Sequence, residues 1–345
     1  MDASPAARPV VTGTETYARE LARRLPEAAP ELEFRFYASR PRPVEGLDLT
    51  VLPGRRLWSQ VRLPVELLQR PPDLFFAPSH VVPFLLRGRA LTVVHDLAFE
   101  RFPEAYAPGA LAYLRLTTRW AERRCPRLIT VSEATARDLV ELHGVPRRRI
   151  AVVPLATTGP AKGLTKAAAR RRVAELGIDR PYVLHVGRVE PRKNQATCLA
   201  AVERLPDLLL VSAGRVVDEE VAGRLRASAR CRLLGQVDGH DLEALYAAAE
   251  ALVFPSLYEG FGLPVLEAMR RGVPVVTAAV SSLPEVGGEA ALYVDDPLDA
   301  EGLAAALERA LSEPDRLRRL GRAQAARFTW DRTAAGVAEV IREVL

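Results

Sequence analysis

Apolar residues recur along this chain in two patterns, short continuous runs that favour buried strands and a spacing of three to four residues that favours helices. In the second half the two patterns alternate regularly, with strands expected at 182–186, 208–212, 231–234, 251–254, 274–277 and 292–294. Helical segments separate these runs, as a parallel, doubly wound α/β sheet requires. Residues 281–285 are expected to cap the helix after the fifth strand.

The first half shows the same α/β alternation in weaker form. Strands are expected at 33–37, 73–77, 91–95, 127–130 and 150–154, and helices at 14–25, 57–69 and 107–124. Thr12 with Glu15 forms a candidate capping box for the first helix. Pro64 is a candidate break in the second helix, and Ser132 is expected to cap the helix that follows it.

The stretch 252–272, LVFPSLYEGFGLPVLEAMRRG, predicts a buried strand, a glycine-bearing loop and an amphipathic helix. Pro264 suits the first helical position, because its missing N–H would have no intrahelical partner there, and Gly272 ends the helix. The loop 258–263 therefore brings free backbone N–H groups and the positive end of a helix dipole, about half an elementary charge, to one point. We expect an anion there, a phosphate above all.

Two carboxylates flank this anion site, Glu259 in the loop and Glu267 about one turn into the helix. Two acids beside a phosphate would repel it unless they bind something else, and neutral hydroxyls suit a carboxylate acceptor. A ligand with hydroxyls at both ends of a diphosphate, a nucleoside diphosphate sugar, satisfies both conditions. The alternative is an ordinary strand-to-helix turn with solvated glutamates.

The loop after the strand at 182–186 has the sequence GRVEPRKN, residues 187–194. Gly187 allows close backbone approach, and Arg188 with Lys193 can bring two cations to one anion. Only three of the 48 basic residues are lysines, so a lysine in this loop is informative. A surface charge cluster is the alternative.

The strings GRxxxxKN and EGFGLPVLE resemble the retaining glycosyltransferases of family 4, also called glycosyl transferase group 1. The resemblance implies the GT-B fold, an α/β architecture of two Rossmann-like doubly wound domains that face an interdomain cleft. In that family the first glutamate contacts the donor sugar, the second holds the ribose, and the Arg and Lys bind the diphosphate. The implied donor-binding residues are Gly187, Arg188, Lys193, Val237, Glu259, Gly260, Phe261, Gly262, Leu263 and Glu267.

The resemblance also covers the first half, where HDLAFERFPE begins at His95. His95 ends a strand, where open α/β sheets place their ligands, and the resemblance puts it beside the donor sugar. The implied catalytic residues are His95, Glu259, Arg188 and Lys193. Weaker cleft or acceptor candidates are Gly13, Ser79, His80 and Asp96.

Three parts are expected: an acceptor-binding domain over 1–157, a donor-binding domain over 158–329, and a helix over 330–345 that crosses back to the first domain. The family has a first strand before its glycine loop, where this chain has only residues 1–3. Either the start is clipped or the sheet lacks a central strand, and both put the role of Gly13 in doubt.

Composition narrows the setting. The 345 residues suit two domains, and no membrane span or signal peptide is evident, so the cytoplasm is expected. Residues 1–157 carry 23 Arg against 17 Asp and Glu, a charge of +6, and residues 158–345 carry −1. All of the excess positive charge therefore lies in the first half of the chain. With an arginine stripe at 115, 119 and 123, this indicates either peripheral contact with an anionic membrane or only an arginine-rich composition. Cys125, Cys198 and Cys231 lack paired spacing and are expected to be core thiols.

The predicted function is a retaining, metal-independent glycosyltransferase that moves a hexose from a GDP-, UDP- or dTDP-linked donor to a saccharide or lipid-linked acceptor, in polysaccharide biosynthesis. No cofactor, metal or nucleic acid is expected, and no Asp-x-Asp motif is present. A nicotinamide dehydrogenase would need GxGxxG after an opening strand, which 11–17 lacks. The alternative is a non-catalytic GT-B partner or nucleotide-sugar-binding protein.

Overall fold

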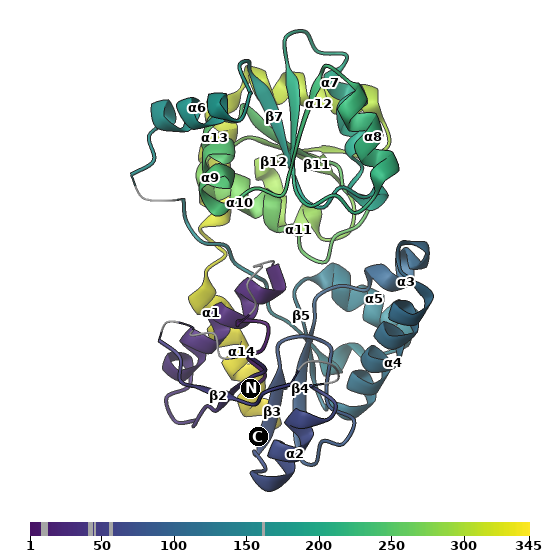
Figure 1. Cartoon of the computed structure of the whole chain (residues 1–345), viewed down its shortest axis with the longest axis vertical. Helices are drawn as coiled ribbons and strands as arrows, with labels where there is room; N and C mark the ends of the chain where they lie inside the picture. The colour runs from purple at the N-terminus through teal and green to yellow at the C-terminus, as the bar shows by residue number, and fades with distance from the viewer. Residues whose placement is uncertain (8–12, 41–43, 45, 55–57, 161–162) are drawn as a thin grey trace. The chain divides into compact units, whose positions relative to one another are not determined.

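The computed structural model describes residues 1–7, 13–40, 44, 46–54, 58–160 and 163–345. The chain divides into two compact units, one formed by residues 1–156 with 328–345 and the other by 157–327. Figure 1 shows the elements of each unit. No helix in the described part is long and apolar enough to cross a bilayer.

Six parallel strands form the sheet of the second unit, and each lies within one residue of a predicted strand. They are β7 (Tyr182–Val186), β8 (Leu209–Ala213), β9 (Cys231–Gly235), β10 (Ala251–Phe254), β11 (Val275–Ala278) and β12 (Ala291–Val294). Their spatial order is β12-β11-β10-β7-β8-β9. Counted from β7, this is the order 3-2-1-4-5-6 of a dinucleotide-binding, doubly wound sheet.

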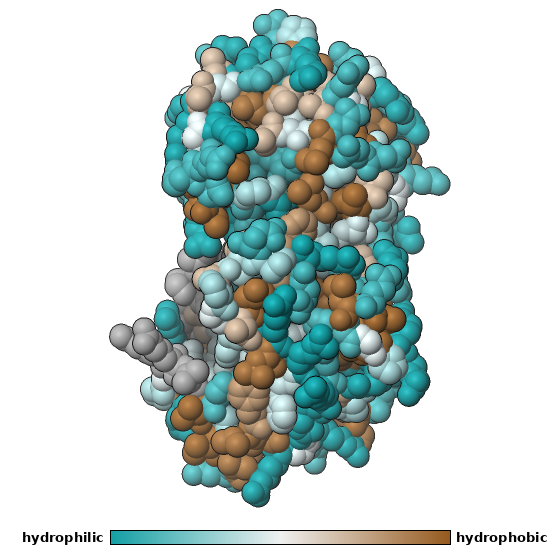
Figure 2. All heavy atoms as spheres, turned by 90° about the vertical axis from the view of Figure 1, so that its right-hand side faces the viewer, coloured by the Kyte–Doolittle hydropathy of each residue, from teal (hydrophilic) through white to brown (hydrophobic). Residues whose placement is uncertain are grey.

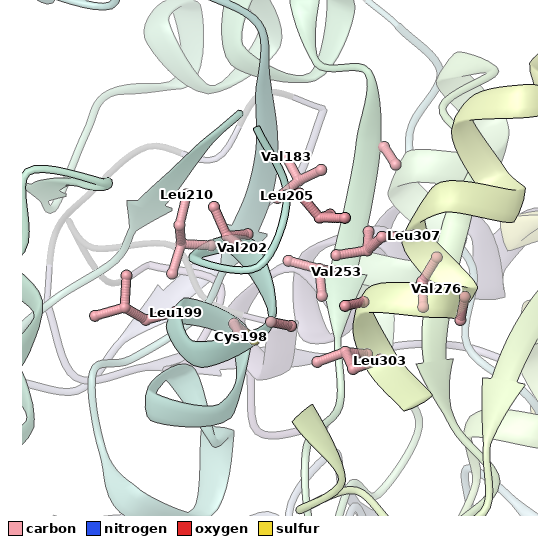
Figure 3. Packing of buried hydrophobic residues seen from close by; sticks show 14 of the residues in the cluster. Val183, Cys198, Leu199, Val202, Leu205, Leu210, Val253, Val276, Leu303 and Leu307 are labelled. Atoms are coloured by element: carbon pink, nitrogen blue, oxygen red, sulfur yellow. The ribbon is translucent and has the colours of Figure 1, made fainter. Parts of the chain in front are cut away.

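Helices cover both faces of this sheet (Figure 1). They are α6 (Lys166–Glu175), α7 (Gln195–Val202), α8 (Glu219–Ala227), α9 (Gly239–Ala248), α10 (Leu263–Arg271), α11 (Leu283–Gly287), α12 (Ala300–Ser312) and α13 (Pro314–Ala325). On one face, apolar side chains of the strands pack against α7, α8 and α12, as Figure 3 shows for Val183, Val253 and Leu307. Each such burial contributes about 1.5–3 kcal/mol, so this core holds the strand ends in place.

The first unit has a shorter parallel sheet. Its strands are β1 (Phe36–Ala38), β2 (Leu49–Val51), β3 (Leu74–Ala77), β4 (Arg89–Val94), β5 (Leu128–Thr130) and β6 (Ile150–Val152). β1 pairs with β2, and the others form the order β3-β4-β5-β6.

Residues 1–3 lie between these two groups of strands. Asp2 forms a parallel bridge with Tyr37, and its N–H donates to Phe76 O at 3.0 Å. The N–H of Ala3 donates to Tyr37 O at 2.8 Å. A single bridge therefore stands in the central position where the family has its first strand.

The helices of the first unit match the expected segments, except that the second begins at Arg62 rather than at residue 57. They are α1 (Gly13–Ala28), α2 (Arg62–Gln69), α3 (Ala98–Arg101), α4 (Pro108–Arg124), α5 (Glu133–His143) and α14 (Trp330–Val344). Pro64 does not break α2, because it lies in the first turn, where its missing N–H would have no partner. Ser132 caps α5 as predicted, its hydroxyl accepting from Thr135 N–H at 3.0 Å. Thr12, half of the predicted capping box, lies outside the described residues.

The C-terminal helix α14 packs on α1 within the first unit. Arg24 Nε donates to Asp331 Oδ1 at 2.9 Å, and Arg342 Nε donates to Glu31 Oε1 at 2.7 Å. Thr333 also donates to Pro154 O at 2.8 Å, which ties α14 to the residues after β6. The last helix thus belongs to the first unit by its contacts.

Candidate active site

The order of the strands in the second unit marks one place for a ligand. β7 pairs with β8 on one side and with β10 on the other, so the sheet reverses its direction of growth there. In open α/β sheets ligands bind beyond the carboxyl ends of the strands at such a switch point. The loops 187–194 and 255–262 follow β7 and β10, so both predicted motifs lie at this point.

Hydrogen bonds join these two loops. Leu257 N–H donates to Arg192 O at 2.9 Å, and Arg192 Nη1 donates to Tyr258 O at 2.6 Å. Asn194, in the left-handed conformation with φ 59°, donates from Nδ2 to Pro255 O at 3.0 Å. The two motifs therefore form one connected structure.

Glu259 is held through one carboxylate oxygen. Its Oε1 accepts from Lys193 Nζ and, at 2.6 Å, from Ser256 Oγ, while Arg192 Nη1 lies 3.8 Å away. The other oxygen, Oε2, has no hydrogen-bond partner among the described residues. Burial alone would raise the pKa of Glu259, but the charges of Lys193 and Arg192 outweigh it and the pKa lies below its ordinary value. An ionised carboxylate with one open oxygen can accept from a sugar hydroxyl.

The cations of the loop after β7 have different environments. Lys193 is buried, and burial lowers its pKa despite the attraction of Glu259. Arg188 is about half exposed, with its Nη2 3.3 Å from Glu190 Oε1. Gln195 Nε2 donates to Arg188 O at 2.7 Å and fixes the backbone that carries this guanidinium. One cation thus orients Glu259, and the other extends toward solvent.

Helix α10 begins at the same edge of the sheet. Gly262 precedes it with φ +99°, and no side chain of the described residues caps its first turn. The conformation at Gly262 favours glycine, and a Cβ there would lie 2.9 Å from Leu283 Cδ2, so that side chain would have to shift. Gly260 and Phe261 are buried in the preceding loop, and Leu263 is the first helical residue. The geometry suits an anion at the start of α10.

Glu267, one turn into α10, is also held through one oxygen. Tyr246 OH donates to its Oε2 at 2.8 Å, and Oε1 has no hydrogen-bond partner among the described residues. Burial raises the pKa of Glu267, against the opposing effects of the Tyr246 hydrogen bond and the Arg271 charge. The two glutamates therefore have opposite pKa shifts.

Val237 lies further along the same edge, in the turn between β9 and α9, and is partly exposed. β9 is two strands from β7, so the turn is displaced along the sheet from the loops that hold the glutamates.

In the first unit, Ser79 and His80 lie beyond the carboxyl end of β3, and His95 with Asp96 lies beyond that of β4. His95 follows β4, and its Nε2 is 2.8 Å from Pro78 O, next to Ser79. Burial lowers the pKa of His95 and lowers that of His80 to about 4, so both rings are neutral at pH 7. Tyr17 contacts the His95 ring edge-on at 5.1 Å between centroids.

Two other candidates have local structural positions. Asp96 Oδ1 accepts from Ala98 N–H at 2.9 Å, at the start of α3. Gly13 is the first residue of α1.

Sequence reasoning missed several residues that hold the glutamates. Arg192 and Ser256 lie inside the recognised stretches 187–194 and 252–272 but were not singled out there. Tyr246 has no sequence signal, because its partner is on another helix. Ser282, in the predicted cap at 281–285, does occupy the N-cap position of α11, but it forms no side-chain cap hydrogen bond, and its Oγ donates to Glu259 O at 2.9 Å. The Ser282 hydroxyl therefore helps to hold the loop that carries Glu259, by donating to its backbone.

The cysteines are free, as predicted, with Cys125 and Cys198 buried and Cys231 partly so. Burial raises the pKa of Cys125 and of Cys231 to about 12. In the described part of the chain, no group of three or more His, Cys, Asp and Glu side chains is arranged to hold a metal ion.

Comparison with known proteins agrees with this geometry. The family described as glycosyl transferases group 1 matches residues 168–327, and glycosyltransferase family 4 matches residues 11–157. O-antigen chain mannosyltransferase B of Escherichia coli is 34% identical over 278 residues, which cover 75% of this chain and 71% of that protein. The serotype-specific mannosyltransferase WbdA of Escherichia coli is 31% identical over 276 residues, 74% of this chain but only 33% of that protein.

Solved structures give the fold. Sucrose-phosphate synthase from Thermosynechococcus elongatus superposes with a TM-score of 0.76 at 22% identity, covering 99% of this chain and 97% of that one. Anabaena Alr3699/HepE in complex with UDP and glucose gives 0.75 at 18% identity, with 97% of each chain covered. The predicted family and fold are thus confirmed. The chain belongs to glycosyltransferase family 4 with the GT-B fold, and it is a hexosyltransferase that takes its sugar from a nucleotide sugar.

Proposed function

We propose that this enzyme is a retaining, metal-independent mannosyltransferase that acts in polysaccharide assembly, on a saccharide or lipid-linked acceptor. Relatives named as mannosyltransferases at 31–34% identity support the sugar. The observation that carries the proposal is Glu259, ionised, fixed through Oε1 by Lys193 and Ser256, and open at Oε2 toward a sugar hydroxyl.

In the proposed reaction the bond from the anomeric carbon to the diphosphate breaks, and a bond forms from that carbon to an acceptor hydroxyl oxygen. The hydroxyl proton passes to the departing phosphate. Negative charge builds on the leaving group, and Arg188, Lys193 and the start of α10 stabilise it by preorganised electrostatics. These three positive groups supply the neutralisation that a metal supplies in other transferases.

On the first unit, we assign His95 to contact with the donor sugar. Its lowered pKa keeps the ring neutral, so it can orient a hydroxyl without adding charge beside a carbon of oxocarbenium character. Ser79, His80 and Asp96 are assigned to the acceptor.

We place the enzyme in the cytoplasm, with peripheral contact to an anionic inner membrane through α4. Arg119 and Arg123 are exposed there, as is 58% of Leu116, whereas Glu122 is buried against His143. Figure 2 faces the side that carries α4 and shows apolar side chains scattered among hydrophilic ones over the first unit. Mixed apolar and cationic surfaces of this kind suit anionic headgroups.

The test is transfer itself. The enzyme is incubated with GDP-, UDP- or dTDP-mannose and a mannose-terminated oligosaccharide, with and without EDTA, and the linkage is assigned by NMR. We expect product from one donor, unaffected by EDTA, with the anomeric configuration of the donor retained. Lys193→Ala should abolish transfer, whereas Lys166→Ala, at an exposed position on α6, should not.

Each other outcome contradicts a defined part of the proposal. An inverted product refutes retention, and loss of activity in EDTA refutes metal independence. Binding of a nucleotide sugar without transfer or hydrolysis would favour the non-catalytic GT-B partner. No nucleoside diphosphate binding at all refutes the donor site.

A further inference from the structure

The support of Glu267 is separate from that of Glu259. Tyr246 on α9 is fully buried, and its phenol donates to Glu267 Oε2 at 2.8 Å. The Arg271 guanidinium lies over the Tyr246 ring at 5.1 Å and donates from Nη1 to Glu267 O at 3.1 Å. Arg271 is itself paired with Glu243 on α9. α9 and α10 are thus tied together around this carboxylate.

The arrangement leaves the two oxygens of Glu267 unequal. A carboxylate has about four acceptor sites, and Tyr246 occupies one of them on Oε2. None of the described residues donates to Oε1. A glutamate side chain loses rotamer freedom when a ligand fixes it in one conformation. The hydrogen bond from the rigid Tyr246 side chain already restricts Glu267 in the free enzyme, so less freedom remains to be lost on binding.

We propose that Tyr246 is a positioning residue for ribose recognition, holding Glu267 by Oε2 so that Oε1 accepts from the ribose hydroxyls of the donor nucleotide. This inference rests on the proposed function, since it assumes a nucleotide at the start of α10. Tyr246 touches neither sugar nor phosphate and acts only through Glu267.

The ionisation of both groups agrees with this geometry. Burial and the neighbouring Glu267 raise the pKa of Tyr246 well above its ordinary value, so the phenol keeps its proton and remains a donor. The hydrogen bond in turn opposes the rise that burial imposes on the pKa of Glu267. Replacing the phenol by phenylalanine would keep the ring under Arg271 and remove only this contact.

The experiment compares two ligands in calorimetry: the nucleoside diphosphate that the enzyme binds, and its 2′,3′-dideoxy counterpart. We expect the native enzyme to favour the ribonucleotide about tenfold or more, since the hydroxyls bond to a charged acceptor. In Tyr246→Phe this ratio should fall to about two or three. The affinity for the dideoxy compound should stay unchanged, because that ligand makes no use of Glu267.

The chain offers a matched control in Tyr182, another buried tyrosine of the second unit, whose OH donates to Leu245 O at 2.6 Å. Tyr182→Phe removes an equivalent buried hydrogen bond and should leave the ratio intact. Glu267→Gln should lower the ratio as Tyr246→Phe does, and the double variant should lose no more than Glu267→Gln alone. Melting curves show whether each variant is folded.

Four results would overturn the inference. Tyr246→Phe could weaken both ligands equally, which would indicate a general structural role, or it could leave the ratio unchanged. A native enzyme that binds the nucleotide but ignores its hydroxyls would refute the role of Glu267 and this inference while leaving the donor site intact. A native enzyme that binds neither ligand would refute the proposed function as well.

Discussion

The Lys193–Glu259 pair gives a quantitative test of how the site is held. Lys193→Met keeps an unbranched apolar side chain and removes the ammonium, whose Nζ lies 5.3 Å from the centroid of the Phe254 ring. Glu259 would keep Ser256 at 2.6 Å and Arg192 at 3.8 Å. The variant thus removes one positive charge beside the Glu259 carboxylate and leaves its other two partners in place.

The magnitude follows from burial. The side chains of Lys193 and Glu259 are each only 11% exposed, so solvent screens the pair little. Removing one partner of a buried pair costs about 3–5 kcal/mol, because the other charge is left without compensation. Arg192 and Ser256 remain, so we expect the lower end, about 3 kcal/mol.

The pH dependence has a definite sign. In the native enzyme the pKa of Glu259 is depressed, so its contribution to stability is present above the unfolded pKa of about 4.3 and is lost as pH falls through the folded pKa. Without Lys193, burial raises the pKa of Glu259. Its charge then destabilises the fold at neutral pH, and protonation relieves the cost. The difference in stability between the native enzyme and Lys193→Met should therefore become smaller as the pH is lowered from 7 to 5.

The assay must report on the second unit, and all three tryptophans, Trp58, Trp120 and Trp330, lie in the first. Amide hydrogen exchange of peptides that cover β7 and β10 is suitable. At pH 7 a loss of about 3 kcal/mol corresponds to exchange about 100-fold faster. Lys166→Met, at an exposed position, is the control.

A double variant decides between charge and packing. Lys193→Met with Glu259→Gln leaves a neutral pair of similar shape and should recover most of the protection. If it is no more protected than Lys193→Met, or if the deficit is the same at pH 5 and pH 7, the lost stability comes from packing. The charge argument would then be wrong.

Two further substitutions test other parts of the fold. The His143 side chain is buried between Glu122 and Glu100, with one ring nitrogen facing each carboxylate. His143→Gln should therefore lower the free energy of unfolding of the first unit by about 2–4 kcal/mol, measured by tryptophan fluorescence in urea. A change below about 0.5 kcal/mol would show that this cluster does not stabilise the fold. Gly262→Ala would force an alanine to φ +99° and bring its Cβ against Leu283. We therefore expect the free energy of unfolding to fall by at least about 1 kcal/mol and nucleoside diphosphate binding to weaken. Unchanged affinity in calorimetry would argue against an anion at the start of α10.

The strands of the second unit could be predicted because buried parallel strands are continuous apolar runs, bounded here by glycine and proline. β2 was missed because Leu-Thr-Val is only three residues long and only partly buried, so it forms no apolar run that stands out. The strand expected at 33–37 is instead Phe36–Ala38, because its pairing with β2 fixes its register. The two glutamates were found from their spacing. Tyr246 and Ser282 were not, because a hydrogen bond between distant elements depends on packing that no local pattern records.

The two glutamates show how one loop and helix can hold two chemically different acceptors. Each is anchored by one oxygen, but Glu259 is anchored by an ammonium with a guanidinium nearby, and Glu267 by a neutral phenol. Burial acts to raise the pKa of both carboxyls, but the charges of Lys193 and Arg192 outweigh it at Glu259, whereas at Glu267 the opposing effects of the Tyr246 hydrogen bond and the Arg271 charge do not. Environments that shift the pKa values of two carboxyl groups in opposite directions suit those groups to different tasks. In the proposed function, the charge of Glu259 suits the sugar, where positive character develops during transfer, whereas Glu267 needs only to accept from the neutral hydroxyls of the ribose.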